Sequence, residues 1–320
     1  MSMPRLRIAT RKSPLALWQA EHVSSLLRQA HPALVVELVP LSTKGDLIQD
    51  RSLAAIGGKG LFIKELEVAI EMGHADMAVH SMKDVPGELP AGFIIGAVLP
   101  RADPRDALIM LKGQSLNDLP QGARVGTSSL RRQAQLLAVR PDLNIQALRG
   151  NVDTRLGRLD KGELEAIVLA CAGLIRLGWE SRITTRLDAK ISLPAVSQGI
   201  IGIECRGDDA TTLHALQPLN HLETRIAMDA ERAFSGYLGG SCQSPIAAYA
   251  VLSRNPLSQD QSSQDQLTLQ GLVAEPDGSR LLRDSLVGSA QDPVALGVAL
   301  AKRLFAAGAG PLLERLRHVQ

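Results

Sequence analysis

The chain has 320 residues, of which 45% are hydrophobic, 21% are charged and 2% are aromatic, and its net charge at pH 7 is +2. One hydrophobic core rarely organises a chain of this length, so two or three domains are expected. The balanced charge and the scarcity of aromatic rings argue against a nucleic-acid partner, which basic patches and stacking platforms would indicate. Apolar runs fall short of the roughly 18 residues of a membrane helix and no apolar signal core is evident, which predicts a cytoplasmic protein without a membrane span.

The first two-thirds of the chain alternate strand and helix patterns. Strands are predicted at residues 6–10, 35–41 and 77–80, with helices at 14–29 and 61–72. The pattern resumes with strands at 107–111, 124–126, 144–148 and 166–170 and helices at 130–139 and 152–160. Such alternation is typical of βαβ units, so we expect two α/β domains with largely parallel sheets.

The last third of the chain changes character. A Gly-rich strand at 199–204 and a helix at 222–234 are followed by alternating strands, a Pro276-Asp277-Gly278 hairpin turn and helices at 293–306 and 311–316. This order predicts a small α+β domain. The polar stretch at 253–266 is expected to form an exposed loop.

Basic and hydroxyl side chains follow several predicted strands. They are Arg11, Lys12 and Ser13; Ser81, Lys83 and Asp84; Thr127, Ser128, Ser129, Arg131 and Arg132; Arg149, Gly150 and Arg155; and Arg176. Ligands of open α/β sheets bind beyond the carboxyl ends of strands, and helix N-termini bind anions. We therefore expect a cleft for a ligand with many negative oxygens. Carboxylates fit best, since guanidinium groups bind them in pairs and no nucleotide-binding motif is present.

Each of these turns also has a simpler interpretation. Residues 127–132 fit a serine N-cap with solvated arginines, and residues 81–84 fit a helix cap with a surface ion pair. His80, Ser81 and Asp84 match the residue types of a serine hydrolase triad, although the Gly-x-Ser-x-Gly elbow is missing.

Three cysteines, Cys171, Cys205 and Cys242, lack the close spacing of zinc sites and disulfide frameworks, so reduced thiols and no metal site are expected. Cys171 follows an apolar run and is expected to be buried. Cys242 stands in Leu-Gly-Gly-Ser-Cys-Gln-Ser-Pro, which predicts an exposed loop. There it fits a nucleophile, a covalent attachment point or an incidental surface residue equally well.

Several long motifs together resemble the porphobilinogen deaminase family, also called hydroxymethylbilane synthases. They are AVHSMKDVP at 78–86, GTSSLRR at 126–132, RGNVDTR at 149–155, SLPAVSQGIIGIE at 192–204 and the Gly-Gly before Cys242. The resemblance begins near residue 6 and thins after about residue 249. It implies a transferase that joins four porphobilinogen molecules head to tail, with release of ammonia, into the linear tetrapyrrole hydroxymethylbilane on the route to haem.

The resemblance also implies an architecture. Two α/β domains like those of type II periplasmic binding proteins would span residues 1–99 with 198–218 and residues 100–197. A C-terminal α+β domain with an antiparallel sheet, residues 219–320, would carry the loop of Cys242. The family is typically monomeric, which implies a monomer with porphobilinogen as its partner.

The site residues follow from the same resemblance. Cys242 would hold a dipyrromethane cofactor by a thioether, and Asp84 would be the essential carboxylate, assisted by Arg11, Arg149 and Arg155. Cofactor contacts would come from Ser13, Ser81, Lys83, Asp84, Thr127, Ser128, Ser129, Arg131, Arg132, Arg149 and Gly150. Substrate contacts would come from Arg11, Arg149, Arg155, Arg176 and Gln198, and Lys59 would lie on a lid loop.

Two other classes of protein remain as alternatives. The first is a non-catalytic two-domain binding protein for a small polycarboxylate or oxyanion, and the second is an acyltransferase with a cysteine nucleophile. The cysteine loop also departs from the family pattern, since Ser241 and Ser244 stand where a glycine and an apolar residue are common.

Overall fold

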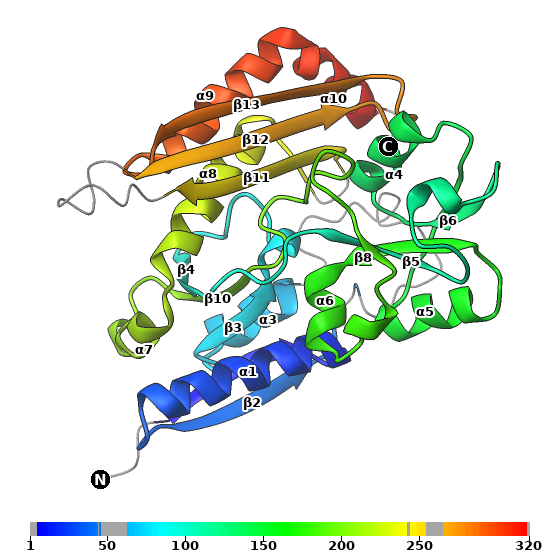
Figure 1. The fold of residues 1–320 in the computed structure, drawn as a ribbon. Helices are drawn as coiled ribbons and strands as arrows, with labels where there is room; N and C mark the ends of the chain where they lie inside the picture. Colours follow the sequence, from blue (N-terminus) through cyan, green and yellow to red (C-terminus); the bar gives the residue numbers. More distant parts are fainter. Residues whose placement is uncertain (1–4, 44, 46–62, 242–243, 254–264, 319–320) are drawn as a thin grey trace. The chain divides into compact units, whose positions relative to one another are not determined.

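The structure is a computed structural model that describes residues 5–43, 45, 63–241, 244–253 and 265–318. The chain forms two compact units, whose helices and strands are drawn in Figure 1. The first unit comprises residues 1–102 and 200–225, and the second comprises residues 103–199 and 226–320. Among the described residues, one sheet lies in the first unit and two lie in the second.

A five-stranded sheet forms the centre of the first unit. Its order is β2-β1-β3-β10-β4, with strands at Val35–Leu41, Arg5–Arg11, Met77–Ser81, Ile201–Arg206 and Phe93–Val98. β1 is parallel to β2 and β3, whereas β10 is antiparallel to β3 and β4. The unit also contains the helices α1 (Pro14–Ala30), α3 (Lys64–Glu71) and α7 (Ala210–Leu216).

Alternate residues of β1 face two different layers of the first unit. Ile8 packs with Val23 and Leu27 of α1, and Ala9 packs with Leu66 of α3. Because successive strand side chains point to opposite faces, α1 and α3 cover opposite faces of the sheet. With both faces covered, the strand ends are the positions left for a ligand.

The second unit repeats this arrangement in a sheet of the order β7-β6-β8-β5-β9. Its strands are Asn144–Gln146, Arg124–Gly126, Ala166–Ala170, Asp106–Met110 and Thr185–Arg186. β6 is parallel to β7 and β8, and β5 is antiparallel to β8 and β9. α4 (Leu130–Val139) and α5 (Val152–Asp160) contribute to different core clusters, and the short α6 (Cys171–Arg176) follows β8.

The second unit also contains a three-stranded antiparallel sheet with helices packed around it. β11 (Ile246–Ser253), β12 (Gln266–Ala274) and β13 (Leu281–Ser289) pair in chain order, and α9 (Pro293–Leu304) packs on β12 and β13 (Figure 1). α8 (Leu222–Tyr237) contributes Phe234 to the same core, and α10 (Gly310–His318) is the last helix of the described part of the chain.

One helical stretch among the described residues has the length and composition of a membrane span. It is Pro293–Leu316, in which 18 residues have a mean hydropathy of 1.3. Gly308, at φ 110°, interrupts it between α9 and α10. Leu296 and Leu300 lie in the core under the three-stranded sheet, so this stretch packs as a core helix of a folded domain.

The predicted fold class is confirmed, with one difference in strand direction. In each α/β sheet one strand, β10 or β5, runs antiparallel to both of its neighbours. Hydrophobic periodicity does not specify direction, because both kinds of pairing place alternate side chains on opposite faces. The predicted turn at 276–278 does join β12 to β13. Residues 254–264 of the predicted polar loop lie outside the described residues, and the domain boundaries after residues 99, 197 and 218 stay a prediction.

Candidate active site

In the first unit, predicted site residues lie at the carboxyl ends of β1 and β3. These strands are parallel neighbours, so both end at the same edge of the sheet. Arg11 ends β1 and Ser13 follows it, whereas Ser81 ends β3 and Lys83 and Asp84 follow it. The Ser81 hydroxyl accepts a hydrogen bond of 2.7 Å from Nε2 of Gln19 in α1. Gln19 is buried, so this bond fixes the Ser81 side chain from within the unit.

A 3₁₀ turn, Met82–Asp84, presents Lys83 and Asp84. Met82 is buried, and its N–H donates to the carbonyl of Ile200 at 3.0 Å. The N–H of Val85 closes the turn on the carbonyl of Met82 at 3.2 Å. Lys83 is half-buried and Asp84 is exposed. The anchor at Met82 therefore holds the Asp84 carboxylate at the surface of the unit.

A buried pair of titratable side chains precedes this turn. Nε2 of His80 lies 2.8 Å from Oε2 of Glu204, and the two side chains are 5% and 0% exposed. Burial raises the pKa of nearby Glu67, and the charge of Glu204 raises it further. Because His80 faces Glu204 and Ser81 accepts from Gln19, this geometry does not support the serine hydrolase interpretation.

In the second unit, one hydroxyl joins two of the predicted turns. Oγ of Ser128 donates to the carbonyl of Leu148 and accepts from its N–H, both at 2.9 Å. The turn at 127–129 is thereby tied to the chain just before Arg149. Ser129 caps α4 by accepting from the N–H of Arg132 at 3.4 Å. The N-cap interpretation is thus correct for Ser129.

Arg149 lies between β7 and α5, and Arg155 lies in the first turn of α5. Nε of Arg155 donates to the carbonyl of Gly150 at 2.8 Å, and Gly150 has a φ of 100°, which side chains rarely tolerate. Nη1 of Arg149 is buried and has no hydrogen-bond partner among the residues that the structure describes. Since buried polar atoms are nearly always paired, this nitrogen indicates a position for an acceptor from a ligand.

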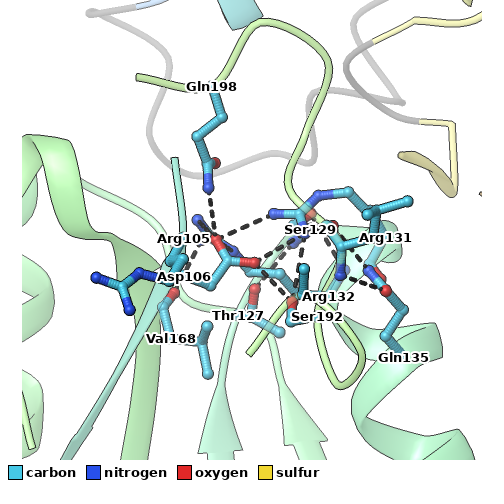
Figure 2. A network of polar contacts seen from close by, with 12 residues as sticks. Arg105, Asp106, Thr127, Ser129, Arg131, Arg132, Gln135, Val168, Ser192 and Gln198 are labelled. Atoms are coloured by element: carbon cyan, nitrogen blue, oxygen red, sulfur yellow. Dashed lines mark hydrogen bonds and ion pairs between the residues drawn. The ribbon is translucent and has the colours of Figure 1, made fainter. Parts of the chain in front are cut away.

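Asp106, the first residue of β5, is the centre of a buried network (Figure 2). Its carboxylate accepts hydrogen bonds from Arg131 and Arg132 in the first turn of α4. The relative exposures are 0% for Asp106, 3% for Arg131 and 6% for Arg132, so these arginines are not solvated. Burial alone would raise the pKa of Asp106, but the two guanidinium groups hold it far below its usual value. Asp106 is therefore a fixed negative charge.

The same network reaches the segment of residues 192–199. Oγ of Ser192 donates to Asp106 at 2.7 Å, and Nε2 of Gln198 donates to Asp106 at 3.0 Å and to the carbonyl of Pro104 at 2.6 Å. Nη2 of Arg176 donates to the carbonyl of Gly199 at 2.7 Å. Burial lowers the pKa of Arg176 to about 10, which leaves it charged at neutral pH.

Asp106 and Gln19 have close contacts to the predicted site but are missing from the sequence-based set. Asp106 has a detectable signal, because a carboxylate at the head of the apolar run Ala-Leu-Ile-Met needs a partner once the strand is buried. Gln19 has a weaker one, as a polar side chain on the apolar side of the helix at 14–29. The sequence alone does not name the partner in either case.

Two predicted residues, Cys242 and Lys59, lie outside the described residues. Cys171 and Cys205 are fully buried, as expected for Cys171, and burial raises their pKa values to about 12 and about 11. Within the described part of the chain, no group of three or more His, Cys, Asp or Glu side chains has a metal-binding arrangement.

Known proteins similar to this chain match it along almost its full length. The family model "Porphobilinogen deaminase, dipyromethane cofactor binding domain" matches residues 6–214, and "Porphobilinogen deaminase, C-terminal domain" matches residues 226–306. The porphobilinogen deaminases of Xanthomonas euvesicatoria pv. vesicatoria and Xanthomonas axonopodis pv. citri are 56% and 57% identical over 314 residues, which is 98% of this chain and 100% of each relative.

One solved structure illustrates a more distant similarity. A putative methionine-binding lipoprotein from Bacillus subtilis is 14% identical, covering 69% of this chain and 92% of its own, with a TM-score of 0.42. No functional conclusion follows at that level. The two family models and the full-length relatives confirm the resemblance that the motifs indicated, and the chain belongs to the porphobilinogen deaminase family.

Proposed function

We propose that the chain is a transferase that joins four porphobilinogen molecules head to tail into hydroxymethylbilane and releases ammonia at each addition. The observation that carries this proposal is the match of both family models, in chain order, over residues 6–214 and 226–306. The cationic turns at strand ends in both units support it, because each pyrrole of the substrate and product carries an acetate and a propionate.

The described residues fit a dipyrromethane cofactor. Nη1 of Arg149 is a buried donor that lacks a protein acceptor within the described part of the chain, and a carboxylate would satisfy it. The N-terminus of α4 at Ser129 adds the partial positive charge of a helix start. When bound, the dipyrromethane supplies the free pyrrole carbon from which the product grows.

We assign the covalent attachment of the cofactor to Cys242. The cofactor's carboxylates and ring N–H groups are assigned to binding residues at the ends of β1, β3, β6 and β7. These are Ser13, Ser81, Lys83, Asp84, Thr127, Ser128, Ser129, Arg131, Arg132, Arg149 and Gly150. Arg11, Arg149, Arg155, Arg176 and Gln198 are assigned to the substrate, and Lys59 to a lid loop. Arg11, Arg149 and Arg155 also assist proton transfer and the departure of ammonia.

Asp84 is assigned the central catalytic role. Loss of ammonia leaves the substrate positively charged, and a carboxylate about 4 Å from that charge contributes about 4 kcal/mol at an effective dielectric of ~20. If this interaction develops mainly in the transition state, it amounts to about three powers of ten in rate. The anchor at Met82 supports the assignment, since electrostatic stabilisation requires a carboxylate that is held in place beforehand.

The intact mass of the purified protein tests the cofactor assignment. We expect an excess equal to two linked pyrrole units when the protein is made in cells that synthesise porphobilinogen, and no excess in Cys242→Ser. Cys171→Ser is the matched control and should keep the excess, because that thiol is buried. An unmodified wild-type chain would instead favour the non-catalytic binding protein.

The role of Asp84 is tested by turnover. Asp84→Asn should keep the mass excess and lose about two to three powers of ten in kcat, in line with the loss of one electrostatic group. Glu88→Gln, an exposed carboxylate four residues further on, should stay near the wild-type rate. Turnover of Asp84→Asn within a few-fold of wild type would remove Asp84 from the mechanism.

We further propose that the protein acts as a cytoplasmic monomer. The basis is the composition and the typical state of the family. Sedimentation of the purified protein at micromolar concentration should give the mass of one chain, and cell fractionation should place it in the soluble cytoplasmic fraction. A stable dimer in sedimentation, or recovery with the membrane fraction, would contradict these assignments.

A further inference from the structure

The Asp106 carboxylate accepts hydrogen bonds from four different side chains. Its Oδ1 accepts from Nε of Arg132 at 2.9 Å, Nη2 of Arg131 at 3.2 Å and Nε2 of Gln198 at 3.0 Å. Its Oδ2 accepts from Nη1 of Arg131 at 2.8 Å and Oγ of Ser192 at 2.7 Å. Both oxygens are therefore fixed from several directions (Figure 2).

These contacts also fix the two guanidinium groups. Arg131 bonds both carboxylate oxygens, and its Nη1 donates to the carbonyl of Leu193 at 2.7 Å. Arg132 adds a bond from Nη1 to the carbonyl of Val168 at 2.9 Å. Since guanidinium is planar, such contacts define the plane of each group and the direction of its remaining N–H bonds.

The charges of this cluster do not cancel. Two guanidinium groups share one carboxylate, so Arg131, Arg132 and Asp106 together carry a net charge of +1. Arg131 and Arg132 stand in the first turn of α4, where the helix dipole adds further positive potential. All three side chains are nearly inaccessible to water. A buried net positive charge is unfavourable by itself and favours the approach of an anionic ligand.

We propose that Asp106 is a positioning residue for the bound pyrrole carboxylates, because it sets the orientation of Arg131 and Arg132 and ties the segment of residues 192–199 to them. This inference rests on the proposed function. Asp106 does not touch the reacting atoms. Its removal should impair the fit of the substrate chain, whereas a merely structural role would reduce only the amount of folded, modified protein.

Steady-state kinetics normalised to the adduct separate these two roles. The fraction of modified molecules is taken from the intact mass, and KM and kcat are then expressed per modified molecule. For Asp106→Asn we expect KM for porphobilinogen to rise about tenfold, because Gln198, which is assigned to the substrate, donates to Asp106 and small misplacements of binding groups are costly. Asp103→Asn is the matched control, because it removes a carboxylate of the same unit that pairs with Arg105 and Arg186. Its KM should stay within about twofold of wild type.

Two milder variants keep the inference testable where Asp106→Asn fails to fold. Asp106→Glu retains the charge but displaces it by one methylene, and Ser192→Ala removes one of the five bonds to the carboxylate. KM should rise about fivefold in the first and less in the second. Wild-type KM and kcat per modified molecule, in Asp106→Asn or in both milder variants, would overturn the inference and leave a structural role.

A second measurement distinguishes this inference from the proposed function. If the wild-type protein carries no adduct and does not consume porphobilinogen, the proposed function fails. Amide hydrogen exchange of residues 192–199 still tests whether Asp106 holds this segment in place. Their exchange should accelerate in Asp106→Glu and Ser192→Ala but not in Asp103→Asn. Unchanged exchange in those two variants would overturn it.

Discussion

Gly202 on β10 leaves no space for a side chain beside the turn that presents Asp84. A Cβ at this position would lie 2.0 Å from Sδ and 2.8 Å from Cγ of Met82. Non-bonded heavy atoms keep ~3.5–4.0 Å, so Gly202→Ala requires Sδ to move by at least about 1.5 Å. Met82 is 1% exposed, and the move must therefore disturb the surrounding core.

The new methyl group can either be forced into the core or expel the Met82 side chain, and the two have similar costs in free energy of unfolding. Forcing an extra methyl group into a packed core costs about 1–3 kcal/mol, and expelling a methionine side chain from it costs about 1.5–3 kcal/mol. We expect the free energy of unfolding to fall by about 1–3 kcal/mol, seen as a lower urea midpoint at an unchanged m-value. Turnover per modified molecule should fall by about 10²-fold, because Lys83 and Asp84 follow Met82 directly and shift with it.

A double-mutant cycle with Met82→Ala tests the reasoning. Shortening Met82 removes both atoms that the new methyl group would meet, so Gly202→Ala should then cost little. Equal costs in the two backgrounds would show that the clash is not with Met82. A stability loss with normal turnover would show that the side chain moves without the turn, and the anchor role assigned to Met82 would then be wrong.

Three further outcomes follow from local geometry. Gly157→Ala should stabilise the protein to urea by about 0.5–1 kcal/mol, because Gly157 lies inside α5 and a Cβ there meets nothing within 4 Å; a lower urea midpoint would contradict this. Cys171 and Cys205, whose pKa values burial raises to about 12 and about 11, should not react with a disulfide reagent at pH 8 until the protein is unfolded, which a thiol titration checks. The hydrogen bond from Arg140 lowers the pKa of Asp142 from 3.8 to about 2, so this pair should stabilise the protein above pH 4 and lose that effect as the pH falls towards 2. The difference in urea midpoint between wild type and Asp142→Asn should accordingly shrink from pH 5 to pH 3, and a growing difference would refute the reasoning.

Local sequence patterns predict much of the fold for physical reasons that the structure makes visible. The helices Leu130–Val139 and Val152–Asp160 have the predicted bounds, since Ser129 and Asn151 cap them and an apolar face continues along each. Strand direction in the two α/β sheets is not predictable in this way. β5 and β10 pair with strands that lie far away in the sequence, and their direction depends on this long-range pairing rather than on periodicity.

The same contrast between local patterns and long-range contacts holds for the candidate site. A basic turn after a strand is a local pattern, and it correctly places residues such as Arg11, Ser81 and Arg149 at strand ends. What lies beneath a turn depends on distant segments. Asp106 meets Arg131 across 25 positions of sequence and Ser192 across 86, so neither contact has a local signature.

In both units, a turn that carries predicted binding residues adjoins a buried cluster of titratable side chains. Beside Ser81 it is His80 with Glu204, and beside Ser129 it is Asp106 with two arginines. Apolar packing alone would bury as much surface, but it is non-directional and would allow the turn to rotate. The hydrogen bonds between Asp106 and the two arginines restrict both distance and angle. Reactions that repeat the same condensation on a lengthening chain need carboxylate-binding groups whose direction does not change between steps, and the Asp106 cluster supplies such directional restraint for Arg131 and Arg132.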